Sequence, residues 1–149
     1  MVRFICETLA AGIGTAAFSL VFHVPPRYFL RCGVTGGLSW MVYLAASHLM
    51  GALPAIFVAT VTVVFFSRFS AVQLRCPVTI FLIPGIFPLV PGLAVYRTAI
   101  ALVAGDMVHV RSAGATALQT AVVMVLAILL GLELPSGLFR RIAGPLGRR

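Results

Sequence analysis

The chain has 149 residues, of which 61% are hydrophobic and 9% are charged, and its mean hydropathy is +1.12. This composition excludes an ordinary soluble domain and predicts an all-α integral membrane protein, since a hydrocarbon core about 30 Å thick needs roughly 20 apolar residues per helix. The formal net charge of +8 comes from eleven arginines against three acids. Most arginines flank apolar runs, so they indicate membrane topology and not a nucleic-acid partner.

In chain order, apolar runs separated by polar or Pro/Gly punctuation predict one transmembrane domain, 1–149, built as a bundle of about five helices. The expected spans are about 4–22, 28–48, 54–66, 78–104 and 112–134. The first run resembles a signal peptide, but four more apolar runs follow it, so we expect it to be retained as a transmembrane helix. We expect the short third run either to extend toward Ala71 or to begin near Leu49.

The arginines distinguish two topologies. Arg97 lies inside the fourth run and is left out of the count. If all five runs cross, eight of the other arginines lie on one side of the membrane and only Arg3 and Arg111 lie in the loops of the other side. If 78–104 returns to the side it came from, five arginines lie on each side. Because cytoplasmic loops are enriched in arginine, five crossings are favoured, with the N-terminus outside and the C-terminus in the cytoplasm. Residues 135–149 are then a cytoplasmic basic tail beside the lipid bilayer. An odd number of spans without an internal repeat favours a partner.

The fourth run contains residues that interrupt helices. Pro84, Pro88 and Pro91 are four and three residues apart, so they share one side of a helix, and Gly85 and Gly92 follow two of them. Proline lacks an N–H and opposes the carbonyl four residues earlier. Within a membrane, unpaired backbone groups are tolerated only against protein or a wet cavity. We therefore predict a broken fourth helix whose proline face points into the bundle.

Three carbonyls, at Ile80, Pro84 and Phe87, lose or weaken their helical partners through these prolines. Discontinuous helices in transporters offer such carbonyls and half-helix ends to substrates and coupling ions. A purely architectural kink is the alternative, because proline is commoner in membrane helices than in soluble ones. The density of helix breakers favours a functional break.

Charged residues in and near the fourth run are candidates for transport chemistry. Arg97 either extends its side chain to the membrane surface, or faces a cavity and binds a substrate carboxylate while Tyr96 donates a hydrogen bond; both interpretations stand. Asp106 is the candidate for proton coupling and the local acceptor for a substrate ammonium, although a carboxylate near a span end needs no special role. Glu7 and Glu133 are weaker coupling candidates.

Other chemistry is not indicated. The cysteines and histidines form no ligand cluster, and neither a nucleophile–base pair nor a phosphate-binding loop is present, so the sequence predicts no metal, no cofactor and no catalysis. Gly33 and Gly37 form a small-xxx-small step in the second run. This step predicts close packing against another helix.

Two stretches, "VFHVPPR" at 21–27 and "IFPLVPGLAVYR" at 86–97, resemble the small membrane subunit of the threonine/serine exporter (ThrE) family in its two-subunit form, over about residues 9–134. The resemblance implies that Pro91, Gly92 and Tyr96 belong to the site, and Arg97 is added because it follows the motif. It also implies a secondary transporter of the bacterial inner membrane, driven by the proton motive force, for threonine and serine or, in a two-subunit branch, succinate. A larger partner subunit with a five-span membrane half is implied as well.

These observations support two possible functions. In the first, the chain is half of a carrier that exports a small carboxylate-bearing metabolite. In the alternative, it is a non-transporting membrane scaffold whose prolines shape a bundle around a partner. The candidate substrate-binding residues are Pro84, Gly85, Pro88, Pro91, Gly92, Tyr96 and Arg97. Arg97 suits a hydroxy amino acid and a dicarboxylate equally, since both offer a carboxylate.

Overall fold

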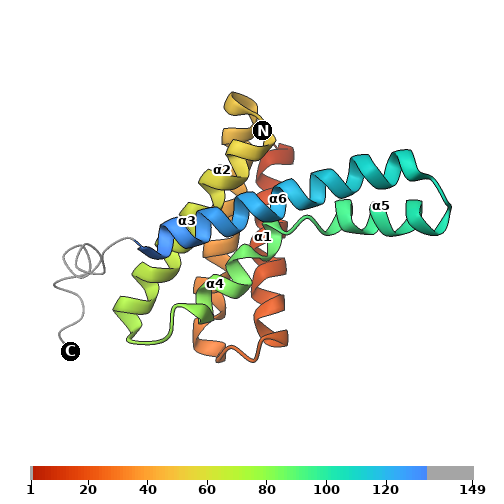
Figure 1. Cartoon of the computed structure of the whole chain (residues 1–149). Coiled ribbons are helices and arrows are strands. Elements are labelled where there is room, and N and C mark those ends of the chain that lie inside the picture. Colours follow the sequence, from red (N-terminus) through yellow and green to blue (C-terminus); the bar gives the residue numbers. More distant parts are fainter. Residues whose placement is uncertain (1, 134–149) are drawn as a thin grey trace.

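The computed structural model describes residues 2–133, and within this range it is helical and contains no strand. The α-helices are α1 (Val2–Val21), α2 (Phe29–Met50), α3 (Ala52–Leu74), α4 (Thr79–Ile86), α5 (Gly92–Val103) and α6 (Met107–Glu133). Two 3-10 turns, η1 (Pro26–Tyr28) and η2 (Phe87–Leu89), precede α2 and follow α4. Figure 1 shows α1, α2 and α3 as an up-and-down bundle with α4 beside them. The predicted all-α fold is confirmed for these residues; the expected basic tail, 135–149, lies outside them.

Glycines bring α1 and α2 close together. A Cβ atom at Gly33 would lie 3.0 Å from the carbonyl oxygen of Gly12, and one at Gly12 would lie 3.1 Å from that of Gly33. At Gly37 it would lie 3.4 Å from the carbonyl oxygen of Thr8. Membrane helices approach this closely where small residues expose their backbones. The close packing predicted for Gly33 and Gly37 is confirmed.

The first half of the fourth run belongs to the core of the bundle. α4 packs against α2 and α3, and Phe81 is fully buried. The Phe81 ring meets that of Tyr28 edge to face, with 5.6 Å between the ring centroids. Leu82 packs into a second cluster with Val63 and Met124. α4 is therefore held mainly by α2 and α3, with a smaller contact to α1, and by the turn before α2.

Three helices, or four, are long and apolar enough to cross a membrane. α1, α3 and α6 qualify alone, and Thr79–Leu89 with Gly92–Val103 qualifies if the bent pair is one span. α2 has 22 residues but does not qualify, because it includes small and polar residues such as Thr35 and Ser39, which are buried within the bundle. The predicted count of about five spans is therefore not confirmed.

Two helices extend beyond the runs expected for them. α3 runs from Ala52 to Leu74, which confirms the extension of the third run toward Ala71 and carries it three residues further, and α6 begins at Met107, before 112. The segment 67–74 has several polar residues, which suggested a loop, but Ser67 and Ser70 are buried. No proline or glycine interrupts the chain there before Pro77. The helix therefore continues through the polar segment.

Arg68 joins α3 to the end of α6. Its guanidinium Nη1 donates to the carbonyl oxygen of Gly131 at 2.9 Å and to that of Leu132 at 2.7 Å. The last carbonyls of a helix have no helical donors, so this arginine caps α6 from a neighbouring helix. Arg68 thus lies inside a helix and has a structural role, whereas the arginine count placed it in a loop.

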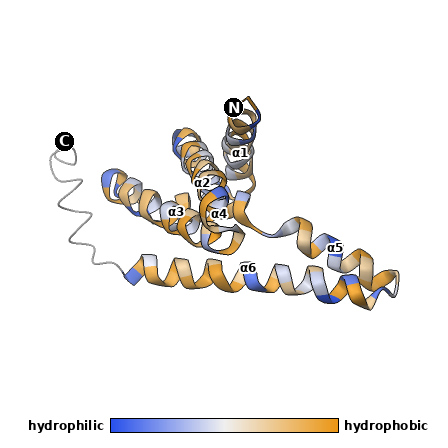
Figure 2. Cartoon of the chain, turned by 90° about the horizontal axis from the view of Figure 1, so that it is seen from above, coloured by the Kyte–Doolittle hydropathy of each residue, from blue (hydrophilic) through white to orange (hydrophobic). Residues whose placement is uncertain are grey.

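α5 and α6 form a hairpin that extends beyond the bundle (Figures 1 and 2). α5 packs mainly on α6, and α6 contacts the bundle through α3. Large apolar side chains are exposed along both helices, among them Leu93, Val95, Ile100, Val103, Leu118, Val122 and Val125. In a membrane protein such a surface faces lipid or another protein.

Candidate functional site

The fourth run bends by 55° between η2 and α5. Val90 is extended, and Pro91 has φ −75° and ψ 49°, which is close to an inverse γ-turn. The turn is closed by the Gly92 N–H, which donates to the Val90 carbonyl oxygen at 2.7 Å. α5 starts immediately afterwards, and the Pro91 carbonyl accepts from the Val95 N–H at 3.0 Å. The break predicted from the prolines is therefore present.

The three carbonyls that the prolines deprive of helical donors find other donors. The thiol of Cys32 donates to the Ile80 carbonyl oxygen, with 3.5 Å from sulfur to oxygen. The Phe87 N–H donates to the Pro84 carbonyl, and the Val90 N–H donates to the Phe87 carbonyl at 3.3 Å. The idea that these carbonyls would be left bare for a substrate is thus wrong, because 3-10 turns and a thiol from α2 satisfy them.

A cavity of about 250 Å³ opens at the break, and we call it the break cavity. Its lining residues are 88–94 together with Trp40, Tyr43, Ile56 and Thr120. α5 begins here without a side-chain cap. The N–H groups of Leu93 and Ala94 belong to its first turn, where donors lack helical partners. Because a helix N-terminus carries partial positive charge, this end of the cavity suits an anion.

Pro84 and Gly85 lie apart from the break cavity, in the packed part of α4. Both are buried, and a Cβ atom at Gly85 would lie 3.0 Å from the side chains of Thr35 and Val63. Pro88 and Pro91, in contrast, are half-buried and line the cavity. The structure therefore divides the proline face into a packing part and a cavity part.

Arg97 and Asp106 meet in a different place, a pocket of about 500 Å³ between α5 and α6. Ser112 and Thr116 add hydroxyl groups to this hairpin pocket. Arg97 has no ion pair within residues 2–133. Tyr96 lines neither this pocket nor the break cavity and is 62% exposed. The predicted site residues are thus not brought together: some line the break cavity, Arg97 and Asp106 line the hairpin pocket, and Tyr96 lines neither space.

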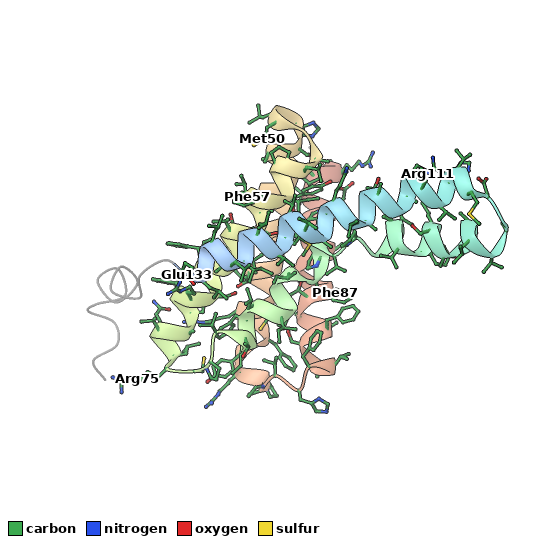
Figure 3. All side chains as sticks on the ribbon, in the orientation of Figure 1. Met50, Phe57, Arg75, Phe87, Arg111 and Glu133 are labelled. Atoms are coloured by element: carbon green, nitrogen blue, oxygen red, sulfur yellow. The ribbon has the colours of Figure 1, made fainter. Side chains whose placement is uncertain are left out.

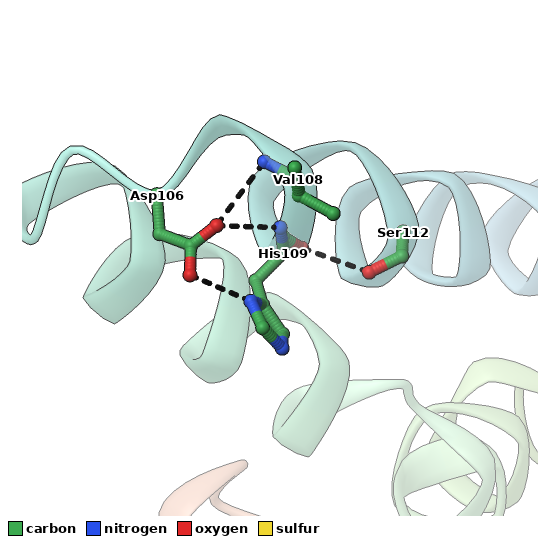
Figure 4. A network of polar contacts seen from close by, with 4 residues as sticks. All are labelled: Asp106, Val108, His109 and Ser112. Carbon is green, nitrogen blue, oxygen red and sulfur yellow. Dashed lines mark hydrogen bonds and ion pairs between the residues drawn. The ribbon is translucent and has the colours of Figure 1, made fainter.

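Asp106 caps the start of α6 (Figure 4). Its Oδ1 accepts from the backbone N–H groups of Val108 at 3.2 Å and His109 at 3.1 Å, and its Oδ2 lies 2.7 Å from the His109 Nδ1. Such bonds satisfy helix N–H groups that would lack partners. The backbone and ring bonds from His109 lower the pKa of the Asp106 carboxyl, because they favour its charged form.

Acidification tests this cap. The pKa of Asp106 in the folded chain is below its ordinary value of 3.8, so the cap's stabilisation is fully present above that value and is lost as the pH falls through the lower one. We expect helical circular dichroism of the chain in nanodiscs to be steady between about pH 7 and 5 and to decline more in strong acid for wild type than for Asp106→Asn, whose amide caps without titrating. An equal decline of the helical signal in wild type and Asp106→Asn would show that the carboxylate does not stabilise α6.

Trp40 was missed by sequence reasoning. It is the single tryptophan of the chain, it lines the break cavity, and its ring lies 5.1 Å from that of Tyr43, measured between centroids. Its indole N–H is buried and has no hydrogen-bond partner within the described residues. The available signal was its place in the middle of the second run, since membrane tryptophans concentrate near the interfaces.

Long apolar helices with a discontinuous fourth segment define a multi-pass membrane protein of the kind found among transporters. A sequence model of this class matches residues 7–133 under the description "Threonine/Serine exporter, ThrE". The chain belongs to the threonine/serine exporter (ThrE) family, which points to a transporter rather than an enzyme.

Two curated relatives are similar to the chain. A protein of Mycobacterium tuberculosis named "Probable threonine/serine exporter" is 27% identical over 93% of this chain and 28% of its own length. An "Uncharacterized protein" of Haemophilus influenzae is 27% identical over 69% of this chain and 35% of its own length. The chain thus spans about a third of these relatives. No solved structure matches it.

Proposed function

We propose that this chain is a subunit of a secondary transporter that exports a small carboxylate metabolite, either threonine and serine or a dicarboxylate such as succinate. The observation that supports this most is the uncapped start of α5 beside the break cavity. In transporters, half-helix N-termini at such breaks bind the anionic group of the substrate. Pro88, Pro91 and Gly92 then shape the cavity around the carboxylate.

Arg97 is the second group that we assign to the carboxylate. It follows Gly92 by five residues, about 8 Å along the helix, and lies on the hairpin pocket. A guanidinium on a mostly apolar helix gains from a carboxylate that accepts two hydrogen bonds. In this proposal the substrate passes along α5 from the break cavity to the hairpin pocket. Tyr96 lines neither space, so in this proposal it contacts the substrate between them, at the exposed face of α5.

A larger subunit completes the transporter in this proposal. The relatives continue well beyond the part that matches this chain, and the α5–α6 hairpin exposes an apolar surface that a partner's helices would cover. A five-span membrane half that begins in the cytoplasm ends outside, where we propose that this chain begins. The C-terminus is then in the cytoplasm of a bacterial cell with the chain in the inner membrane.

Basic residues support this orientation. Arg31 Nη1 donates to the Gln73 Oε1 at 2.7 Å, so the start of α2 and the end of α3 lie together, and Arg68 binds the end of α6. We propose that this arginine-bearing end faces the cytoplasm.

Asp106, at the opposite end of α6, is the proposed proton-coupling residue. Its cap on α6 must open before the carboxylate takes up a proton, since the cap favours the charged form.

Export assays with Arg97→Ala test the proposal. In cells of the source organism that lack their own copy of this chain, wild type should restore export of labelled threonine or labelled succinate. Arg97→Ala should lower that export about tenfold or more, because hydrogen bonds between charged groups are worth about 1.5–3 kcal/mol. The matched control Arg111→Ala changes an arginine beside the hairpin tip (Figure 3) and should change export less than about twofold.

The scaffold alternative makes the opposite prediction for these variants. It expects Arg97→Ala and Tyr96→Phe to leave activity of the complex intact, whereas Gly33→Leu and Gly92→Leu prevent its assembly. The exposed hairpin is the observation that favours a scaffold. If wild type restores export of neither substrate, the carrier proposal is rejected.

A further inference from the structure

Gln119 is a polar side chain in the middle of α6 to which the proposed transport function assigns no role. It lies about 18 Å along the helix from Met107 and about 21 Å from Glu133. α6 is one of the helices that are long and apolar enough to cross a membrane alone. The Gln119 carboxamide is therefore held well inside the helix, far from both of its ends.

The carboxamide of Gln119 has no hydrogen-bond partner among residues 2–133. The neighbouring hydroxyl groups differ, because Ser112 and Thr116 donate to carbonyls of their own helix at 3.2 Å and 3.0 Å. Gln119 is also exposed on the helix surface. A polar group without a partner is costly in hydrocarbon, so such side chains in membrane helices bond to another helix. The Gln119 side chain thus needs a partner that the described residues do not supply.

Gln119 belongs to the face of α6 that points away from the bundle, which we call the outer face. Figure 2 shows α6 along one flank of the molecule, with the bundle on one side of it. The inner face packs on α3 and buries Met124, Ala127 and Gly131. The outer face is formed by exposed residues spaced four and three apart, namely Ala115, Gln119, Val122, Leu126 and Leu129. This spacing is the heptad pattern along which two helices pack side by side.

The outer face suits a copy of itself. A carboxamide contains both donors and an acceptor, so it is complementary to an identical group, which a charged side chain is not. Ala115, one turn before Gln119, is small enough to let a second helix come close. The charged residues of this side, Arg111 and Glu133, lie near the two ends of the helix, where water and salt screen the repulsion between copies.

We propose that the outer face of α6 binds the same face of a second copy of this chain, with the two Gln119 carboxamides hydrogen-bonded to each other. In a contact between identical faces, the residue at the two-fold axis meets its own counterpart. Each Gln119 then donates an N–H to the carbonyl oxygen of the other, so both polar groups are satisfied. A single polar residue in an apolar helix seam also fixes the register of the two helices.

This contact is separate from the proposed transport site. No outer-face residue lines the break cavity or the hairpin pocket. Large exposed side chains of α5, such as Leu93 and Val103, are not part of the outer face and stay available to the larger subunit. The inference therefore stands or falls independently of the substrate and of the coupling ion.

Energy transfer between donor-labelled and acceptor-labelled full-length chains measures self-association in vesicles of phosphatidylethanolamine and phosphatidylglycerol. Diluting the chain with lipid should lower the transfer along a dimerisation curve. We expect Gln119→Leu to need a roughly tenfold higher protein-to-lipid ratio than wild type for half association, because it loses the bonds across the contact. Gln119→Asn keeps a carboxamide and should stay within about threefold of wild type. Gln73→Leu makes the same change at the only other glutamine, at the end of α3, and should behave as wild type.

Cysteine cross-linking tests the face itself. In a Cys6→Ser background, which removes the exposed native thiol, mild oxidation in the same vesicles should join Leu126→Cys into a covalent dimer. Val125→Cys is the control, because the adjacent position is also exposed but points about 100° away around the helix.

Three results would overturn the proposal. They are a wild-type chain that remains monomeric at every dilution, equal association of wild type and Gln119→Leu, and more cross-linking at Val125→Cys than at Leu126→Cys. Helical circular dichroism should be the same in all variants, since Gln119 makes no side-chain bond within the described part of the chain. A loss of helix in Gln119→Leu would place the role of this residue within one chain and would also contradict the proposal.

Discussion

Replacing Gly36 by alanine is expected to lower the free energy of unfolding of the chain by about 3 kcal/mol, at the upper end of the usual cost of overpacking a well-packed core. A Cβ atom at Gly36 would lie 2.0 Å from the Thr15 Oγ1, 2.6 Å from its Cβ and 2.8 Å from its Cγ2. Turning the Thr15 side chain cannot relieve the contact with its own Cβ. Thr15 is also 1% exposed and bonded to the Ala11 carbonyl at 2.8 Å, so α1 and α2 must move apart.

Thermal unfolding of the chain in detergent, followed by circular dichroism, measures this effect. Gly14→Ala is the matched control in α1, because a Cβ atom there would meet nothing within 4 Å; alanine should leave stability unchanged or raise it slightly through its better helix propensity. Combining Gly36→Ala with Thr15→Gly should recover part of the loss. Equal melting temperatures for Gly36→Ala and Gly14→Ala would refute the close crossing of α1 and α2.

Hydropathy located the helices but not their ends. The apolar runs 4–22 and 28–48 overlap α1 and α2 almost completely, because an apolar stretch in lipid must satisfy its backbone within a helix. The end of α3 was predicted only as one of two alternatives, an extension toward Ala71, and hydropathy did not decide between them. Arg68 looked like a loop residue, but its partners are carbonyls 63 and 64 positions further along the chain, and no local pattern reveals them.

The break itself was predictable because proline acts on its own backbone. The residues that surround the break were not predictable from the sequence. The donor for the Ile80 carbonyl is Cys32, 48 residues away, and the cavity walls come from Trp40 and Thr120 as well as from the motif. Sequence proximity also suggested that Pro91 and Arg97 share one site. The 55° bend instead carries α5 away from the bundle, so Arg97 lines a separate pocket with Asp106.

Replacing Gly92 by leucine is expected to abolish substrate binding without unfolding the chain. A Cβ atom at Gly92 would meet nothing within 4 Å, so the new side chain starts into open space and we expect the helices to keep their places. Gly92 nevertheless lines the break cavity, and a leucine there occupies space that the carboxylate needs near the first turn of α5. Gly14→Leu is the control, because it adds the same side chain at another uncrowded glycine, outside the residues that line the cavity.

Ligand binding at Trp40 tests most directly the claim that this chain holds the substrate at its broken helix. Trp40 is the only tryptophan and lines the break cavity, so its fluorescence in the purified full-length chain in nanodiscs reports on occupancy. Titration with threonine, and separately with succinate, should give a saturable change for at least one of them in wild type and Gly14→Leu, and none in Gly92→Leu. An unresponsive wild type, or the same saturable change in Gly92→Leu, would contradict a substrate site at the break.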